Sequence, residues 1–71
     1  MLNVDKLKAK IVENRTNVHE LSKRIGIDKS TFYRKLSGRT DFTIKEASMI
    51  SKELQLTHDE VNAIFFNQNI A

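Results

Sequence analysis

Apolar residues recur every three or four positions along most of the chain, which is the spacing of an amphipathic helix. Val18, Leu21 and Ile25 fall on one face of one such segment, and Phe32 and Leu36 lie four apart in the next. Proline is absent, and so are runs that alternate apolar with polar residues, as a half-exposed strand would. The pattern therefore predicts an all-α protein.

Residues that favour the N-cap position mark four of the expected helix starts. Asn17, Thr43 and Thr57 are each followed three positions later by a glutamate. This is the capping-box signature, in which the glutamate side chain bonds back to the backbone amide of the cap residue. Asp28 is a fourth residue of the N-cap type. With a first helix over residues 4–14, the sequence predicts five short helices joined by short turns.

The same spacing predicts the inward face of the remaining helices. In the first, fourth and fifth helices the expected core residues are Val4, Leu7, Ile11 and Val12, then Ile44, Ala47, Ile50 and Leu54, and finally Val61, Ile64 and Phe65. The apolar run 63–66 cannot face one core as a whole, because neighbouring helical positions diverge by about 100°. We therefore expect Phe66 to point outward and to form a patch with Asn62 and Ile70. We expect the tail, residues 67–71, to fray.

Gly26 separates the second and third helices. Glycine readily adopts the left-handed conformation that ends a helix and turns the chain sharply. Ile27 follows as an apolar plug, so residues 17–37 have the outline of a helix-turn-helix. The third helix then presents to solvent the side chains of Lys29, Ser30, Tyr33 and Arg34. Arginine and lysine can reach the O6 and N7 acceptors of guanine, and serine both donates and accepts, so this helix is suited to reading DNA.

Composition argues against several other classes of function. The chain of 71 residues has no cysteine, which removes disulfides, thiolate metal sites and thiol nucleophiles. His19 and His58 lie in different helices without a partner at metal-ligand spacing, and no glycine-rich loop is present to hold a phosphate. We expect one domain, residues 1–71, that is not an enzyme and uses no metal, cofactor or small-molecule substrate.

The formal net charge of +3 is divided unequally along the chain. Residues 1–40 carry a net charge of +6, whereas residues 41–71 carry −3. The division suggests one face for phosphate and another for protein, although the charges could also simply solvate helix surfaces. No apolar run is long enough to span a membrane, and the first residues lack the order of a secretion signal. We expect a cytoplasmic protein without a membrane partner.

From about residue 17 to residue 61 the chain resembles the Cro/repressor-type (Xre-like) helix-turn-helix family of phage and bacterial transcription regulators. The resemblance runs without gaps through the turn at Gly26, the Ser37-Gly38-Arg39 loop, the helix opened by Thr43, and residues 54–61. It implies a five-helix, lambda-repressor-like domain. Within the family the chain is most similar to small stand-alone proteins of temperate phages of Gram-positive bacteria, which act at the lysis–lysogeny switch. The resemblance therefore implies a bacterial host cell and association with its nucleoid.

The resemblance also implies roles for particular residues. The positions three, four and eight residues after the turn glycine usually touch base edges in this family, and here they are Lys29, Ser30 and Arg34. Tyr33 could pack on a thymine methyl, bond a phosphate, or fold over the edge of the core. The positions expected to contact phosphates, which set register more than sequence preference, are Thr16, Asn17, Lys35, Ser37, Arg39 and Thr40.

One position departs from the family pattern. The family usually has an apolar residue nine positions after the turn glycine, but here that residue is Lys35, and Leu36 follows it. The third helix could therefore be rolled by up to one residue step, about 100°. Such a roll would change which side chains reach the bases.

Two functions remain open at this point. The first is a Cro-like repressor that binds operator DNA, and the second is an antirepressor or co-regulator that acts mainly by docking on a phage repressor protein. The Phe66 patch fits either a homodimer or a partner protein, unless it is a lone exposed phenylalanine. A two-fold homodimer would place two reading helices about one DNA turn apart on a palindromic operator.

Overall fold

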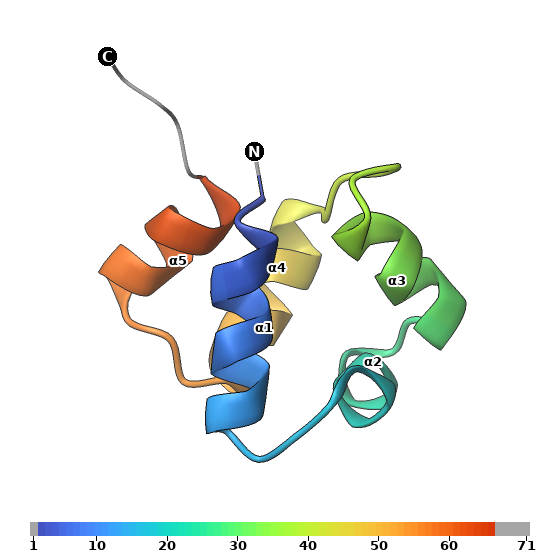
Figure 1. Cartoon of the computed structure of the whole chain (residues 1–71), viewed down its shortest axis with the longest axis horizontal. Coiled ribbons are helices and arrows are strands. Elements are labelled where there is room, and N and C mark those ends of the chain that lie inside the picture. The colour runs from blue at the N-terminus through green and yellow to red at the C-terminus, as the bar shows by residue number, and fades with distance from the viewer. Residues whose placement is uncertain (1, 67–71) are drawn as a thin grey trace.

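The computed structural model describes residues 2–66, which form five helices (Figure 1). They are α1 (Val4–Glu13), α2 (Val18–Ile25), α3 (Lys29–Leu36), α4 (Ile44–Glu53) and α5 (His58–Phe65). No strand occurs within the described range, so the all-α prediction is confirmed. The expectation that residues 67–71 fray lies outside the described residues.

The four expected N-caps all occupy the position before a helix. Thr43 and Thr57 each form a complete capping box, with Glu46 and Glu60 respectively. At Asn17 the side chain accepts the N–H of Glu20 at 2.9 Å, but the structure gives no reciprocal bond from the glutamate. Asp28 precedes α3 without bonding a helix amide, and its carboxylate accepts the Ser30 hydroxyl at 3.1 Å. The sequence thus predicts where these helices begin more reliably than which bonds cap them.

The core joins all five helices. It consists of Leu7, Ile11, Leu21, Ile25, Phe32, Leu36, Ile50, Leu54 and Ile64. The α2 helix packs on α3 and on α4, whereas α5 packs on α1 and on α4. In Figure 1, α2 and α3 lie on one side of the molecule, and α1, α4 and α5 lie on the other. The fold therefore leaves the outer face of α3 uncovered by the other helices.

Two expected core residues are exposed instead. Val12 is 73% exposed and Ile44 is 80% exposed. Val12 lies one helical step, about 100°, past the buried Ile11, which takes it off the α1 stripe. Ile44 is the first residue of α4 and lies at the edge of the stripe that Ala47, Ile50 and Leu54 bury. These two predictions were wrong because spacing alone does not show where a buried stripe ends.

Candidate nucleic-acid interface

The turn between α2 and α3 forms as the sequence predicts. Gly26 has φ +77° in the left-handed region, where a side chain would be strained although there is open space for one. The N–H of Gly26 bonds the Lys23 carbonyl at 3.2 Å, and the N–H of Ile27 bonds the Ser22 carbonyl at 3.0 Å. Ile27 packs against the core. These contacts end α2 and set the direction of α3.

The α3 helix divides its residues between the core and the outer surface. Phe32 is 0% exposed and Leu36 is 6% exposed. The side chains expected to contact bases, Lys29, Ser30, Tyr33 and Arg34, are all exposed. Tyr33 is 53% exposed. The helix therefore presents one contiguous polar and basic face.

Lys35 differs from the other expected phosphate-contacting residues. Its Nζ lies 2.5 Å from Glu46 Oε1 and 5.9 Å from the centre of the Phe42 ring. The side chains of Lys35 and Glu46 are only 11% and 14% exposed. The amine is therefore paired within the protein, and the phosphate contact expected of Lys35 stays a prediction. Leu36 takes the buried position beside it.

The Glu46 carboxylate has two tasks at once. Its Oε1 accepts the N–H of Thr43 at 2.9 Å, which closes the capping box of α4, and the same oxygen meets Lys35. Burial by itself raises the pKa of Glu46, but the hydrogen bonds from Lys35 and from the Thr43 amide outweigh it and hold that pKa below its usual value. The Glu46 carboxylate is therefore ionised at neutral pH.

The other expected phosphate contacts lie at the start of α2 and just after α3. Thr16 is half-buried, and the Asn17 side chain is used as the α2 cap. The Ser37 hydroxyl donates to the Arg34 carbonyl at 2.8 Å. Arg39 and Thr40 are exposed in the loop after α3. Of these residues, Arg39 offers the strongest attraction for a phosphate.

Three basic side chains on or beside α3 keep their charge available. Among the ion pairs formed within residues 2–66, none involves Lys29, Arg34 or Arg39. No carboxylate within the described residues therefore neutralises these three cations through an ion pair. This arrangement suits the binding of a polyanion.

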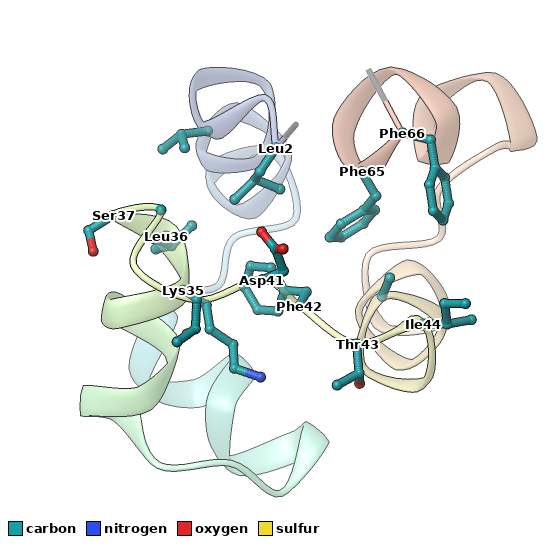
Figure 2. Close-up of a pocket in the computed structure, with 14 residues that line it drawn as sticks. Leu2, Lys35, Leu36, Ser37, Asp41, Phe42, Thr43, Ile44, Phe65 and Phe66 are labelled. Carbon is teal, nitrogen blue, oxygen red and sulfur yellow. The ribbon is translucent and has the colours of Figure 1, made fainter. Parts of the chain in front are cut away.

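A groove lies between the loop after α3, α4 and α5 (Figure 2), and its volume is about 570 Å³. Phe65 points toward Phe42 inside it, with ring centres 5.9 Å apart. Phe66 is 49% exposed at its outer edge, close to the exposed Ile44. The outward placement expected of Phe66 is confirmed, whereas Ile70 lies outside the described residues.

The Lys35–Glu46 pair is a feature that sequence reasoning missed. The capping-box signature marks Glu46 as an α4 residue, but nothing in the local sequence shows that a lysine from α3 reaches it. The available signal was the polar residue in a position that the family usually fills with an apolar one. A buried cation requires a partner, so Lys35 itself called for an acid nearby.

A family model described as a Cro/C1-type HTH DNA-binding domain matches residues 6–65. The chain belongs to this family. No significant match was found among curated proteins or solved structures. The resemblance to the Cro/repressor-type family is therefore confirmed, and the face of α3 described above belongs to a Cro/C1-type DNA-binding domain. None of its helices within residues 2–66 is long and apolar enough to cross a membrane.

Proposed function

We propose that this Cro/C1-type domain is a sequence-specific transcriptional regulator that inserts α3 into the major groove of operator DNA. The observation that carries the proposal is the division of α3 between two faces. Phe32 and Leu36 are buried, while Lys29 and Arg34 are exposed and make no ion pair within the described residues. An α-helix fits the major groove, where base edges present a distinct pattern for each base pair.

Individual side chains have different parts in this proposal. Arg34 and Lys29 bond guanine acceptors, Ser30 adapts to either donor or acceptor, and Tyr33 contacts a thymine methyl or a phosphate. The start of α2 and the loop after α3 hold the phosphate backbone through Thr16, Asn17, Ser37, Arg39 and Thr40. These contacts set register, and the α3 contacts set sequence preference.

In its biological role the protein acts as a Cro-like repressor at a phage lysis–lysogeny switch, in the cytoplasm and at the nucleoid of a bacterial host. It represses transcription by occupying a promoter. It does so as a homodimer on a palindromic operator, with the exposed Phe66, Asn62 and Ile44 surface at the contact between copies.

The same apolar surface favours a second candidate function. Ile44 is largely exposed and Phe66 is about half exposed beside the groove, and residues 41–71 are net acidic. An antirepressor or co-regulator would use this surface to dock on a phage repressor protein. DNA binding would then be weak or without sequence preference.

Selection from a random pool of double-stranded DNA at near-physiological salt separates the two candidates. The first function predicts enrichment of a short motif by the wild-type chain and its loss in Arg34→Ala. Lys52→Ala is the matched control, because Lys52 is an exposed cation on α4. Binding without any motif would contradict the first function and favour the second, whereas an Arg34→Ala protein that enriches the same motif equally well would contradict the assignment of Arg34 to a base contact.

A further inference from the structure

The α3 helix is attached to the rest of the domain in few ways. It is eight residues long, and it packs chiefly on α2 through the turn at Gly26. Its buried stripe consists of Phe32 and Leu36. Two buried residues on one stripe hold a helix against its neighbours but restrain its rotation about its own axis only weakly. Additional contacts at the edge of the stripe are needed to fix that rotation.

Lys35 supplies such a contact. Within residues 2–66 its ion pair with Glu46 is the one that ties α3 to another helix, α4. The partner oxygen is itself fixed, because Glu46 Oε1 also accepts the N–H of Thr43 at the N-terminus of α4. The lysine is therefore anchored to the backbone of α4 through a single carboxylate.

The aromatic side chains beside the pair strengthen the anchor. The Lys35 side chain lies next to Phe42 in the groove (Figure 2). Phe42 makes edge-to-face contacts with Phe32 at 5.2 Å and with Phe65 at 5.9 Å between ring centres. The ring is thus held from two sides, and the lysine is confined between it and Glu46.

We infer that Lys35 is a positioning residue for DNA recognition: its ion pair with Glu46 fixes the rotation of α3 about its axis and thereby the direction of Arg34 and Ser30. The inference rests on the proposed function, and it identifies what sets the specificity of that surface. Side chains reach about 5–6 Å from the helix axis, so a rotation of about 10° moves their tips by about 1 Å. A displacement of that size is enough to disrupt a hydrogen-bonded contact with a base edge.

The test compares base discrimination, meaning the affinity for the selected motif divided by that for a scrambled duplex. Lys35→Met keeps the apolar stem and removes the charge. Glu46→Gln keeps the capping box, which glutamine also forms, and removes only the ion pair. We expect each variant to lower base discrimination about tenfold, we expect the double variant to lower it no further, and we expect Lys35→Arg to retain it.

The chain provides a matched control in a second pair of the same kind. Lys10 of α1 reaches Glu60, the capping-box glutamate of α5, and within residues 2–66 neither residue forms an ion pair with α3. Lys10→Met and Glu60→Gln should lower thermal stability and leave base discrimination unchanged. All proteins are compared at a temperature at which circular dichroism shows each to be folded. If Lys35→Met does not fold, Glu46→Gln carries the comparison.

Other results would overturn the inference in recognisable ways. A phosphate contact by Lys35 predicts that Lys35→Met flattens the dependence of log affinity on log salt by about 0.9 while Glu46→Gln does not. A purely structural pair predicts that all four charge-removing single variants lose stability and keep their base discrimination. A wild-type protein without any preferred motif would instead remove the proposed function itself, which distinguishes that failure from failure of the inference.

Discussion

The two capping boxes of this domain share one design and differ in what depends on them. Glu46 caps α4 and binds Lys35 of α3, and Glu60 caps α5 and binds Lys10 of α1. In each case a lysine from a distant part of the fold is added to a local motif. The first pair holds the proposed reading helix, whereas the second joins two helices of the scaffold. The comparison teaches that the same combination of a capping box and a distant lysine can join two scaffold helices or attach the proposed reading helix to the scaffold.

The two pairs differ in detail as well. The Lys35 and Glu46 side chains are 11% and 14% exposed, and those of Lys10 and Glu60 are 18% and 23% exposed. Lys35 shares an oxygen of Glu46 with the Thr43 amide, whereas Lys10 binds the oxygen of Glu60 that the Thr57 amide leaves free. The pair on α3 is thus drier and more tightly coupled to its cap. Its removal should cost more stability.

The largest effect on stability is expected from truncating a core residue that also packs beside the Lys35–Glu46 pair. Phe32 is fully buried and contacts Phe42 beside Lys35. Phe32→Ala should lower the free energy of unfolding by about 3–5 kcal/mol, which leaves so small a domain largely unfolded. Chemical denaturation followed by circular dichroism measures this. A stable, cooperatively folded Phe32→Ala protein would show that α3 does not turn this side chain inward.

The next effect sharpens the comparison between contacts that read bases and contacts that hold phosphates. Arg34→Ala should weaken binding to the selected motif by about 1–3 kcal/mol and relax preference at one base pair. Arg39→Ala should instead weaken binding to all sequences alike and reduce the salt slope by about 0.9. Fluorescence anisotropy on motif and scrambled duplexes at several salt concentrations separates the two. The same loss of preference in both variants would contradict the assignment.

Breaking the two ion pairs should destabilise the protein to different extents. Lys35→Met should cost about 1–3 kcal/mol, because it leaves the Glu46 carboxylate mostly buried without its cation. Lys10→Met should cost less, because the Glu60 carboxylate is more exposed. Thermal unfolding of both variants beside the wild type tests the order. A Lys10→Met protein less stable than Lys35→Met would reverse the comparison.

The smallest expected effect is on the pH dependence of stability. The hydrogen bond from Lys10, supported by the Thr57 amide, lowers the pKa of Glu60 to about 2 from its ordinary 4.5. Because this pKa is lower in the folded state than in the unfolded state, the Glu60 carboxylate stabilises the fold above about pH 4.5. This contribution to the free energy of unfolding is lost as the pH falls toward 2. Glu60→Gln should therefore make unfolding less dependent on pH within that window. A pH dependence equal to that of the wild type would exclude this contribution.

Much of the fold could be predicted because its signals are local. Helix periodicity, Gly26 and the threonine caps act through neighbours in the sequence, and the structure has the expected helices and turn. Val12 and Ile44 were misplaced because burial at the edge of a stripe depends on what the rest of the fold covers. That information is tertiary and is absent from a short window of sequence.

The candidate site was predictable to the same extent. The periodicity that buries Phe32 and Leu36 also determines which α3 side chains are exposed. The pairing of Lys35 with Glu46, eleven residues away, could not be predicted, because a long flexible side chain finds its partner only after the helices pack. The part of the site that could not be predicted without the tertiary structure is thus the environment of Lys35, the residue that departs from the family pattern.

The most direct test of the account is to map the surface that DNA covers. Backbone amide NMR spectra of the labelled domain would be recorded during titration with the selected duplex. At a ratio of one protomer per half-site, the account predicts chemical-shift changes concentrated on α3, the start of α2 and the loop containing Arg39. The amide signals of the exposed face of α1 around Lys8 should not shift. Shifts centred on Ile44 and Phe66 with α3 unaffected would contradict the claim that α3 reads DNA.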